Sequence, residues 1–287
     1  TYYIIIVEVV KLNKYSIIFL ALIISLFFIG SVSAIDMENI DNNQTIDSDS
    51  QGVIDLNQNQ KVLKQDIAEE DMGQSQEIVV DDWAEIQYYC SLSDDDYVLK
   101  LKENTNYYPN DPSDSSNQIV VKNNVKIIGS QGAYIGDASP NARNIAYTAI
   151  KVNDNAGIGI FLQNVTFKWI STSYQPDGTF LQMAGNVNNT FENCNFSEIS
   201  TNMGHSSIVH IKLGSVLLKN CNFFNCTTDF GCLSVYNPDD DPTGTCTRAS
   251  MEVTDCYFEG NYARTEPGCI NNCGILVVNN STFYRNS

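Results

Sequence analysis

Positive charge is scarce in this sequence. It contains 16 lysine and arginine residues against 34 aspartate and glutamate residues, which gives a formal net charge of −18. Such a surface repels phosphate backbones and anionic lipid headgroups, so nucleic acid is not an expected partner. The same acidity suits a solvated, exported protein.

Motifs of common enzyme classes are also missing. The only histidines are His205 and His210, and we find no Ser-His-Asp arrangement, phosphate-binding loop or dinucleotide fingerprint. The segments "GHSS" and "HIK" around these histidines faintly resemble polygalacturonase motifs, which keeps a polysaccharide-active enzyme as an alternative function.

Acidic residues do not pair in the way that inverting glycoside hydrolysis needs, with carboxylates converging on the scissile bond. Between residues 157 and 205 the acids are Asp177, Glu192 and Glu198, with no Asp-Asp pair. The run 239–241 is acidic but lies between two prolines, which is typical of a solvated turn. We therefore assign no catalytic residue and expect a protein that is not an enzyme.

Long amphipathic helices are absent between the apolar runs. In "YVLKLK", Leu99 and Leu101 alternate with Lys100 and Lys102, a period of two that predicts a strand with one buried face. Similar short runs rich in β-branched residues follow, separated by polar turns. Without helices between the strands, an alternating β-α-β fold is disfavoured and an all-β fold is predicted.

The N-terminal region has the three parts of a secretory signal. Lys11 and Lys14 precede the apolar run 17–29, and Val32-Ser33-Ala34 supplies a cleavage site after Ala34. We predict a signal peptide region at 1–34, with the true start at Val10. An uncleaved anchor remains an alternative, because 15–34 is long enough for a membrane span.

The rest of the chain divides into two parts. Residues 35–78 are polar and acidic, with sparse apolar residues, which predicts a disordered linker. Residues 79–287 are predicted to form one β-domain, truncated at the C-terminus because Ser287 falls inside a repeat. At its start, "DDWAEIQYYC" predicts a short capping helix with Asp82 as N-cap and Trp83, Ile86 and Cys90 on one face.

A motif of Asn or Asp, two residues and Phe recurs through this domain. The phenylalanines lie 29, 27, 35 and 25 residues apart, and periods of this length with short strands predict a β-solenoid. We expect the rings to stack in the core, the Asn to adopt left-handed backbone in a turn, and the residue between them to fill a small inward slot. The five rings are Phe167, Phe196, Phe223, Phe258 and Phe283.

These repeats resemble known surface proteins. "GCL" and "GCI" with "FEGN" and "FYRN" are similar to repeats of polymorphic outer-membrane proteins. The whole layout, with "NVKIIGSQGAYIGD" before the repeats, resembles the adhesin-like surface proteins of methanogenic archaea. That resemblance implies a right-handed parallel β-helix of the pectate-lyase type over about 79–287.

Nine cysteines are present, and eight of them follow residue 190. Cys194, Cys221 and Cys256 share one repeat position, while Cys232 and Cys269 share another. Stacked disulfides and buried free thiols both remain open for these positions. Cys269 and Cys273 have no second regular pair and no nearby histidine, so we assign no metal and no cofactor.

Several Asn-x-Ser/Thr sequons could carry glycans on an exported chain, although an Asn-rich repeat creates such sequences by chance. We expect Asn164 and Asn280 to lie buried in ladders of the repeat. The sequons begin at Asn43, Asn164, Asn188, Asn195, Asn225, Asn279 and Asn280.

Together these features predict a secreted or cell-surface protein that presents loops to glycans or cell-surface partners. A passive surface spacer is a third alternative. Membrane contact is expected only through the N-terminal segment or a missing C-terminal anchor.

Overall fold

The structure is a computed structural model, and it describes residues 76–93, 95–152, 157–173, 180–183, 188–201, 206–235, 249–265 and 268–287. The predicted signal peptide region 1–34 and the predicted linker up to residue 75 lie outside these ranges.

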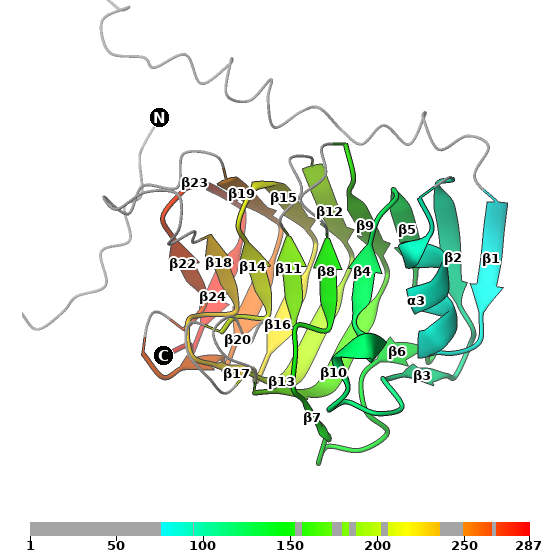
Figure 1. Ribbon diagram of the computed structural model, residues 1–287. Coiled ribbons are helices and arrows are strands. Elements are labelled where there is room, and N and C mark those ends of the chain that lie inside the picture. Colours follow the sequence, from blue (N-terminus) through cyan, green and yellow to red (C-terminus); the bar gives the residue numbers. More distant parts are fainter. Residues whose placement is uncertain are drawn as a thin grey trace, which may run out of the picture. The chain divides into compact units, whose positions relative to one another are not determined.

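Three sheets of parallel strands form the described part of the chain (Figure 1). Sheet A contains β1 (Gln76–Val80), β2 (Tyr97–Leu101), β5 (Val125–Ile128), β9 (Ile160–Gln163), β12 (Asn188–Glu192), β15 (Gly214–Lys219), β19 (Ala249–Thr254) and β23 (Ile275–Asn279). Sheet B contains β3 (Asn106–Tyr107), β6 (Tyr134–Ile135), β7 (Asn144–Ile145), β10 (Thr166–Thr172), β13 (Asn195–Thr201), β16 (Asn222–Phe224), β17 (Thr227–Thr228), β20 (Tyr257–Glu259), β21 (Tyr262–Ala263) and β24 (Thr282–Tyr284). Sheet C contains β4 (Ile119–Val121), β8 (Ile150–Val152), β11 (Leu181–Met183), β14 (Val209–Ile211), β18 (Leu233–Val235) and β22 (Ile270–Asn272).

The chain visits the sheets in a fixed order. It passes from β9 in sheet A to β10 in sheet B, then to β11 in sheet C, and returns to sheet A at β12. Each strand therefore pairs with the strand one circuit later, as β10 does with β13. This path confirms the mostly β fold and is consistent with a parallel β-solenoid.

The repeated phenylalanines stack inside this structure. Successive rings from Phe167 to Phe283 have centroids 4.8, 4.5, 4.7 and 4.7 Å apart, with interplanar angles of 6° or less. The first four rings are fully buried, while Phe283 is 39% exposed. Because the rings follow the strand spacing of about 4.8 Å, the predicted aromatic ladder is confirmed.

The turn from sheet A to sheet B carries the predicted asparagine ladder. Asn164, Asn193, Asn220, Asp255 and Asn280 all have φ between 45° and 56°. Asn tolerates this left-handed backbone better than most residues. The backbone amides of the first four donate to the next circuit, as Asn193 N does to Lys219 O at 3.0 Å. The side chains also join, because Asn220 Nδ2 donates to Asn193 Oδ1 at 2.7 Å.

Helix α3 (Trp83–Ser91) lies beside β4 at the N-terminal end of the sheets (Figure 1). The Asp82 carboxylate accepts from the Glu85 amide at 2.9 Å, and Trp83, Ile86 and Cys90 are buried. The Gln87 amide donates to Ser116 O within η1 (Ser115–Asn117) and to Gln118 O just after it. The predicted N-cap and apolar face of the helix are confirmed, and the helix covers core residues that would otherwise face solvent.

Strand β1 spans Gln76–Val80 and pairs with β2. The last three residues of the predicted linker are thus part of sheet A. Tyr107 lies across the end of this strand, and its hydroxyl donates to Val80 O at 2.7 Å.

Candidate binding surface on sheet B

The side chains on either side of each stacked phenylalanine point away from the core, because successive side chains of a strand alternate between faces. Strand pairing brings these residues into two outward rows, which we call the outer face of sheet B. The row before the rings contains Tyr134, Thr166, Asn195, Asn222, Tyr257 and Thr282. The row after them contains Lys168, Ser197, Phe224, Glu259 and Tyr284.

A second ladder of left-handed residues follows the second row. Trp169, Glu198, Asn225, Gly260 and Arg285 have φ between 50° and 65°. Strand pairing is interrupted here, since Lys168 pairs with Ser197 and Ile170 with Ile199 while the residues between them do not pair. The chain bends at this position, and its side chains extend the outer face of sheet B.

Four residues form a compact group at one end of this face, the Trp169 cluster: Tyr134, Lys168, Trp169 and Glu198. The Tyr134 and Trp169 rings meet edge to face with centroids 5.9 Å apart. The Lys168 ammonium lies 3.9 Å from the Tyr134 centroid and 4.2 Å from that of Trp169. Trp169 Nε1 donates to the Glu198 carboxylate at 2.9 Å. Glu198 is exposed and the other three side chains are partly exposed.

Amide groups and a second aromatic pair continue the outer face of sheet B. Asn222 Nδ2 donates to Asn195 Oδ1 at 2.8 Å. One circuit further, the Phe224 and Tyr257 rings lie 5.6 Å apart. The Tyr257 hydroxyl donates to Glu259 at 3.1 Å, which raises the pKa of Tyr257. The face thus alternates aromatic pairs with hydrogen-bonding groups along the stack of strands.

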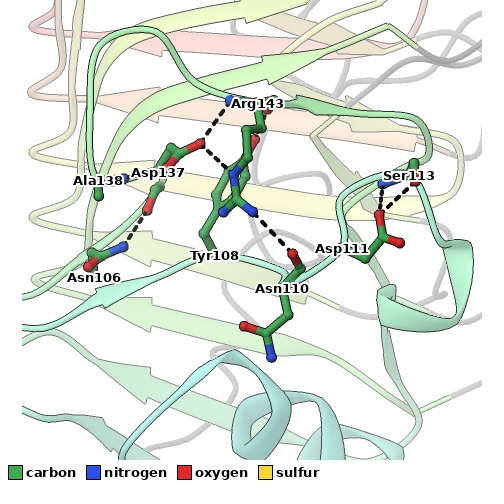
Figure 2. Close-up of polar contacts among 9 residues, drawn as sticks. Asn106, Tyr108, Asn110, Asp111, Ser113, Asp137, Ala138 and Arg143 are labelled. Atoms are coloured by element: carbon green, nitrogen blue, oxygen red, sulfur yellow. Dashed lines mark hydrogen bonds and ion pairs between the residues drawn. The ribbon is translucent and has the colours of Figure 1, made fainter.

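An ion pair between a buried aspartate, Asp137, and the exposed Arg143 lies beside this face, in the loop after β6 (Figure 2). The Asp137 carboxylate accepts from the Ala138 amide at 2.7 Å and from the Arg143 amide at 2.8 Å, and it pairs with Arg143 Nε at 3.1 Å. The Arg143 guanidinium lies over the Tyr108 ring and donates to Asn110 O, while the Tyr108 hydroxyl donates to Arg143 O. Burial alone raises the pKa of Asp137, but these donors outweigh it and hold the pKa below its ordinary value.

This ion pair is an internal brace. Asp137 is 8% exposed, and its carboxylate accepts hydrogen bonds from its own loop. The Asp137 amide donates to Trp169 O at 3.1 Å, and Gly136 N donates to Tyr107 O at 2.9 Å. A side chain at Gly136 would meet Lys168 O at 1.6 Å. The loop therefore fixes the backbone on which Lys168 and Trp169 lie.

The structure places Glu192, Glu198 and His210, three of the acids and histidines that the sequence singled out, in three different sheets. Glu192 ends a strand of sheet A and bonds to Gln163 and Lys219, whereas Glu198 bonds to Trp169 on sheet B. His210 is 3% exposed in sheet C, with Nδ1 2.7 Å from Ser234 Oγ. His205, Asp177 and residues 239–241 lie outside the described residues.

The eight described cysteines are free thiols. Cys194, Cys221 and Cys256 occupy the inward slot before the phenylalanines and are 0–2% exposed, as predicted for that position. Cys232 and Cys269 lie side by side, since Leu233 pairs with Ile270. Burial raises the pKa of Cys90 to about 12 and that of Cys232 well above its ordinary value. The thiol alternative thus holds for these eight, and Cys246 lies outside the described residues.

Sequon residues Asn164 and Asn280 do lie in the turn ladder, but they are exposed, so the expectation that they are buried is wrong. The turn projects its left-handed residues outward while the following small residue points inward. Asn43 lies outside the described residues.

The sequence analysis did not single out the Trp169 cluster. A signal was present at the repeat position two residues after the stacked Phe. Some circuits have Asn225 and Gly260 there, which tolerate left-handed backbone, whereas others have Trp169 and Glu198, which do not favour it. That conflict between residue type and backbone became visible only once φ was known.

Comparisons with known proteins assign no relative: no family model, no curated protein and no solved structure matches the chain. Within the described ranges, no group of three or more His, Cys, Asp or Glu side chains could hold a metal ion. The helices described are also too short or too polar to cross a membrane.

Proposed function

We propose that this chain is an exported, non-catalytic surface protein that binds glycans, similar to the adhesin-like proteins of methanogenic archaea. Its secretion and cell-surface location follow from the predicted signal peptide and the acidic composition. The proposal rests above all on one observation, the outer face of sheet B, where aromatic pairs alternate with amide and carboxylate groups.

That face matches the chemistry of a sugar chain. A saccharide ring presents an apolar face of C–H groups and a rim of hydroxyls that both donate and accept hydrogen bonds. Partly exposed aromatic rings can cover the face of C–H groups, and carboxylate, amide and ammonium groups can form hydrogen bonds with the hydroxyls. Because the rows run from circuit to circuit, several sugar units could lie along one face.

The finer fold proposed for the domain is a right-handed parallel β-helix of the pectate-lyase type. The parallel pairing and the three-sheet circuit support this. Connections between parallel strands of one sheet are right-handed in nearly all proteins, because strand twist favours that hand. The inserts at 171–179 and 237–250, rich in Pro, Gly, Asp and Ser, were expected to carry the function, and most of their residues lie outside the described residues.

A glycan array probed with the full chain tests this function. We expect binding to a defined subset of glycans, and the absence of binding to every glycan would refute the proposal. In parallel, release of reducing or unsaturated sugars from pectin-like polysaccharides would contradict the non-catalytic assignment, and loss of that release in His205→Ala would favour the enzyme alternative.

A further inference from the structure

The backbone at the second left-handed ladder does not favour the residues that form the Trp169 cluster. Trp169 has φ 54° and Glu198 has φ 52°. Bulky side chains rarely adopt this conformation, whereas Gly and Asn do so readily. Equivalent positions in later circuits hold Asn225, Gly260 and Arg285. The fold accepts small residues at this position, so folding does not explain an indole there.

Trp169 is less buried than the other tryptophan of the chain, Trp83. Its ring is partly exposed, in contrast to Trp83, which is 4% exposed and donates to Asn117 O at 2.8 Å. The contacts of Trp169 are instead polar and outward: its Nε1 donates to Glu198, and the Lys168 ammonium lies against its ring. Strained backbone that is retained at an exposed group of this kind is typical of functional sites.

Two polar groups of the cluster have bonding capacity left. Lys168 forms no ion pair with a carboxylate of the described residues, so its ammonium can still donate hydrogen bonds. Glu198 uses one carboxylate oxygen for Trp169 and keeps the other as an acceptor. An ammonium donor and a carboxylate acceptor thus flank two aromatic rings that the braced loop of Asp137 holds in place.

We propose that Tyr134, Lys168, Trp169 and Glu198 form a binding platform for one neutral sugar ring of a glycan chain. This rests on the glycan-binding function proposed above and gives it a location. The Trp169 ring stacks on the apolar face of the sugar, and the Tyr134 ring, at 83° to it, contacts the edge of the sugar. Lys168 donates to a ring or hydroxyl oxygen, and Glu198 accepts from a hydroxyl.

Charge selects a neutral sugar over an acidic one. Within the cluster the Lys168 and Glu198 charges cancel, and the chain as a whole has a formal net charge of −18. A uronic acid would therefore approach a negative field and meet the Glu198 carboxylate at the site.

The left-handed backbone allows an unusual test, because Trp169→Gly removes the indole without opposing the fold. The probes are the neutral hexasaccharides of β-1,4-glucan, mannan and galactan, with oligogalacturonate as the acidic comparison, each titrated into the full chain by calorimetry. We expect at least one neutral probe to bind, and Trp169→Gly to weaken that binding roughly tenfold or more. The melting temperature should stay within about 4 °C of the parent value.

Asn220→Gly is the matched control, since it also places Gly at an exposed left-handed position, but in the turn from sheet A to sheet B and off the outer face of sheet B, and it should leave the affinity unchanged. Glu198→Gln should weaken the same binding while it preserves side-chain shape. Binding that survives Trp169→Gly overturns the platform but leaves the proposed function intact. Binding of oligogalacturonate alone overturns the neutral-sugar assignment. If the full chain binds none of these probes and no array glycan, both the platform and the proposed function fail.

Discussion

Replacement of Phe196 by Ala tests the aromatic ladder at its most enclosed point. Phe196 is fully buried, and its ring lies 4.8 Å from Phe167 and 4.5 Å from Phe223. Truncation of a buried Phe to Ala costs about 3–5 kcal/mol, and each aromatic pair adds about 0.5–1.5 kcal/mol beyond the buried area. Because the substitution removes two stacked pairs, we expect the free energy of unfolding to fall by an amount near the upper end of this range, about 4–5 kcal/mol.

Phe283→Ala provides the comparison within the same ladder. Phe283 is 39% exposed and, among the described residues, stacks on one ring only, that of Phe258, at 4.7 Å. Its removal should cost about 1–2 kcal/mol, because less apolar area returns to water and one stacked pair is lost.

Urea unfolding followed by circular dichroism measures both changes as shifts of the midpoint at constant slope. A changed slope would signal that the circuits unfold separately, as repeat proteins can. Equal losses for the two variants would refute the reasoning, since they would show that stacking on both sides adds nothing to the stability of the ladder.

Three further predictions concern the turn ladder, the braced loop and the thiols. Asn193→Ala should lower the unfolding free energy by about 2 kcal/mol in the same urea assay, because Ala disfavours left-handed backbone and cannot accept the hydrogen bond from Asn220. Asn193→Gly should lower it less, because Gly adopts this backbone readily. The pKa of Asp137 is lowered from 3.8, so its contribution to stability is present above that pH and disappears as the pH falls through the folded pKa. The difference in melting temperature between the parent and Asp137→Asn should therefore shrink in acid. A difference that stays constant with pH would count against the brace. Thiol titration should detect at least eight free thiols in denaturant but few in the native protein, because seven of the eight described cysteines are buried, and a lower count after denaturation would reveal disulfides.

Periodicity made the fold largely predictable. The spacing of Phe167 and its equivalents identified one equivalent residue in each circuit. The Asn or Asp before each ring indicated a turn, because these residues tolerate the left-handed backbone that the turn requires. The capping helix was also predictable, since Asp82 and the apolar spacing of Trp83, Ile86 and Cys90 are local signals. These features depend on residues close together in the sequence or on their exact repetition.

The candidate site could not be predicted in the same way. Tyr134, Trp169 and Glu198 come from three successive circuits and meet only because parallel pairing stacks them. The stacked phenylalanines specify the register of Trp169 against Glu198, but the circuit of Tyr134 has Ile135 in place of the Phe, so its position beside Trp169 could not be taken from the spacing. The same limit applied to Asn164 and Asn280, whose place in the ladder was predicted but whose exposure depends on which way the turn faces.

The most direct test of glycan binding by this face uses the two tryptophans of the chain. In a nitrogen–proton correlation spectrum each indole N–H gives one signal, and Trp169→Gly assigns them. Addition of a glycan that binds should shift the Trp169 signal and leave that of Trp83, which is buried and bonded to Asn117 O, in place. A bound glycan that leaves the Trp169 signal unmoved would contradict binding at the Trp169 cluster.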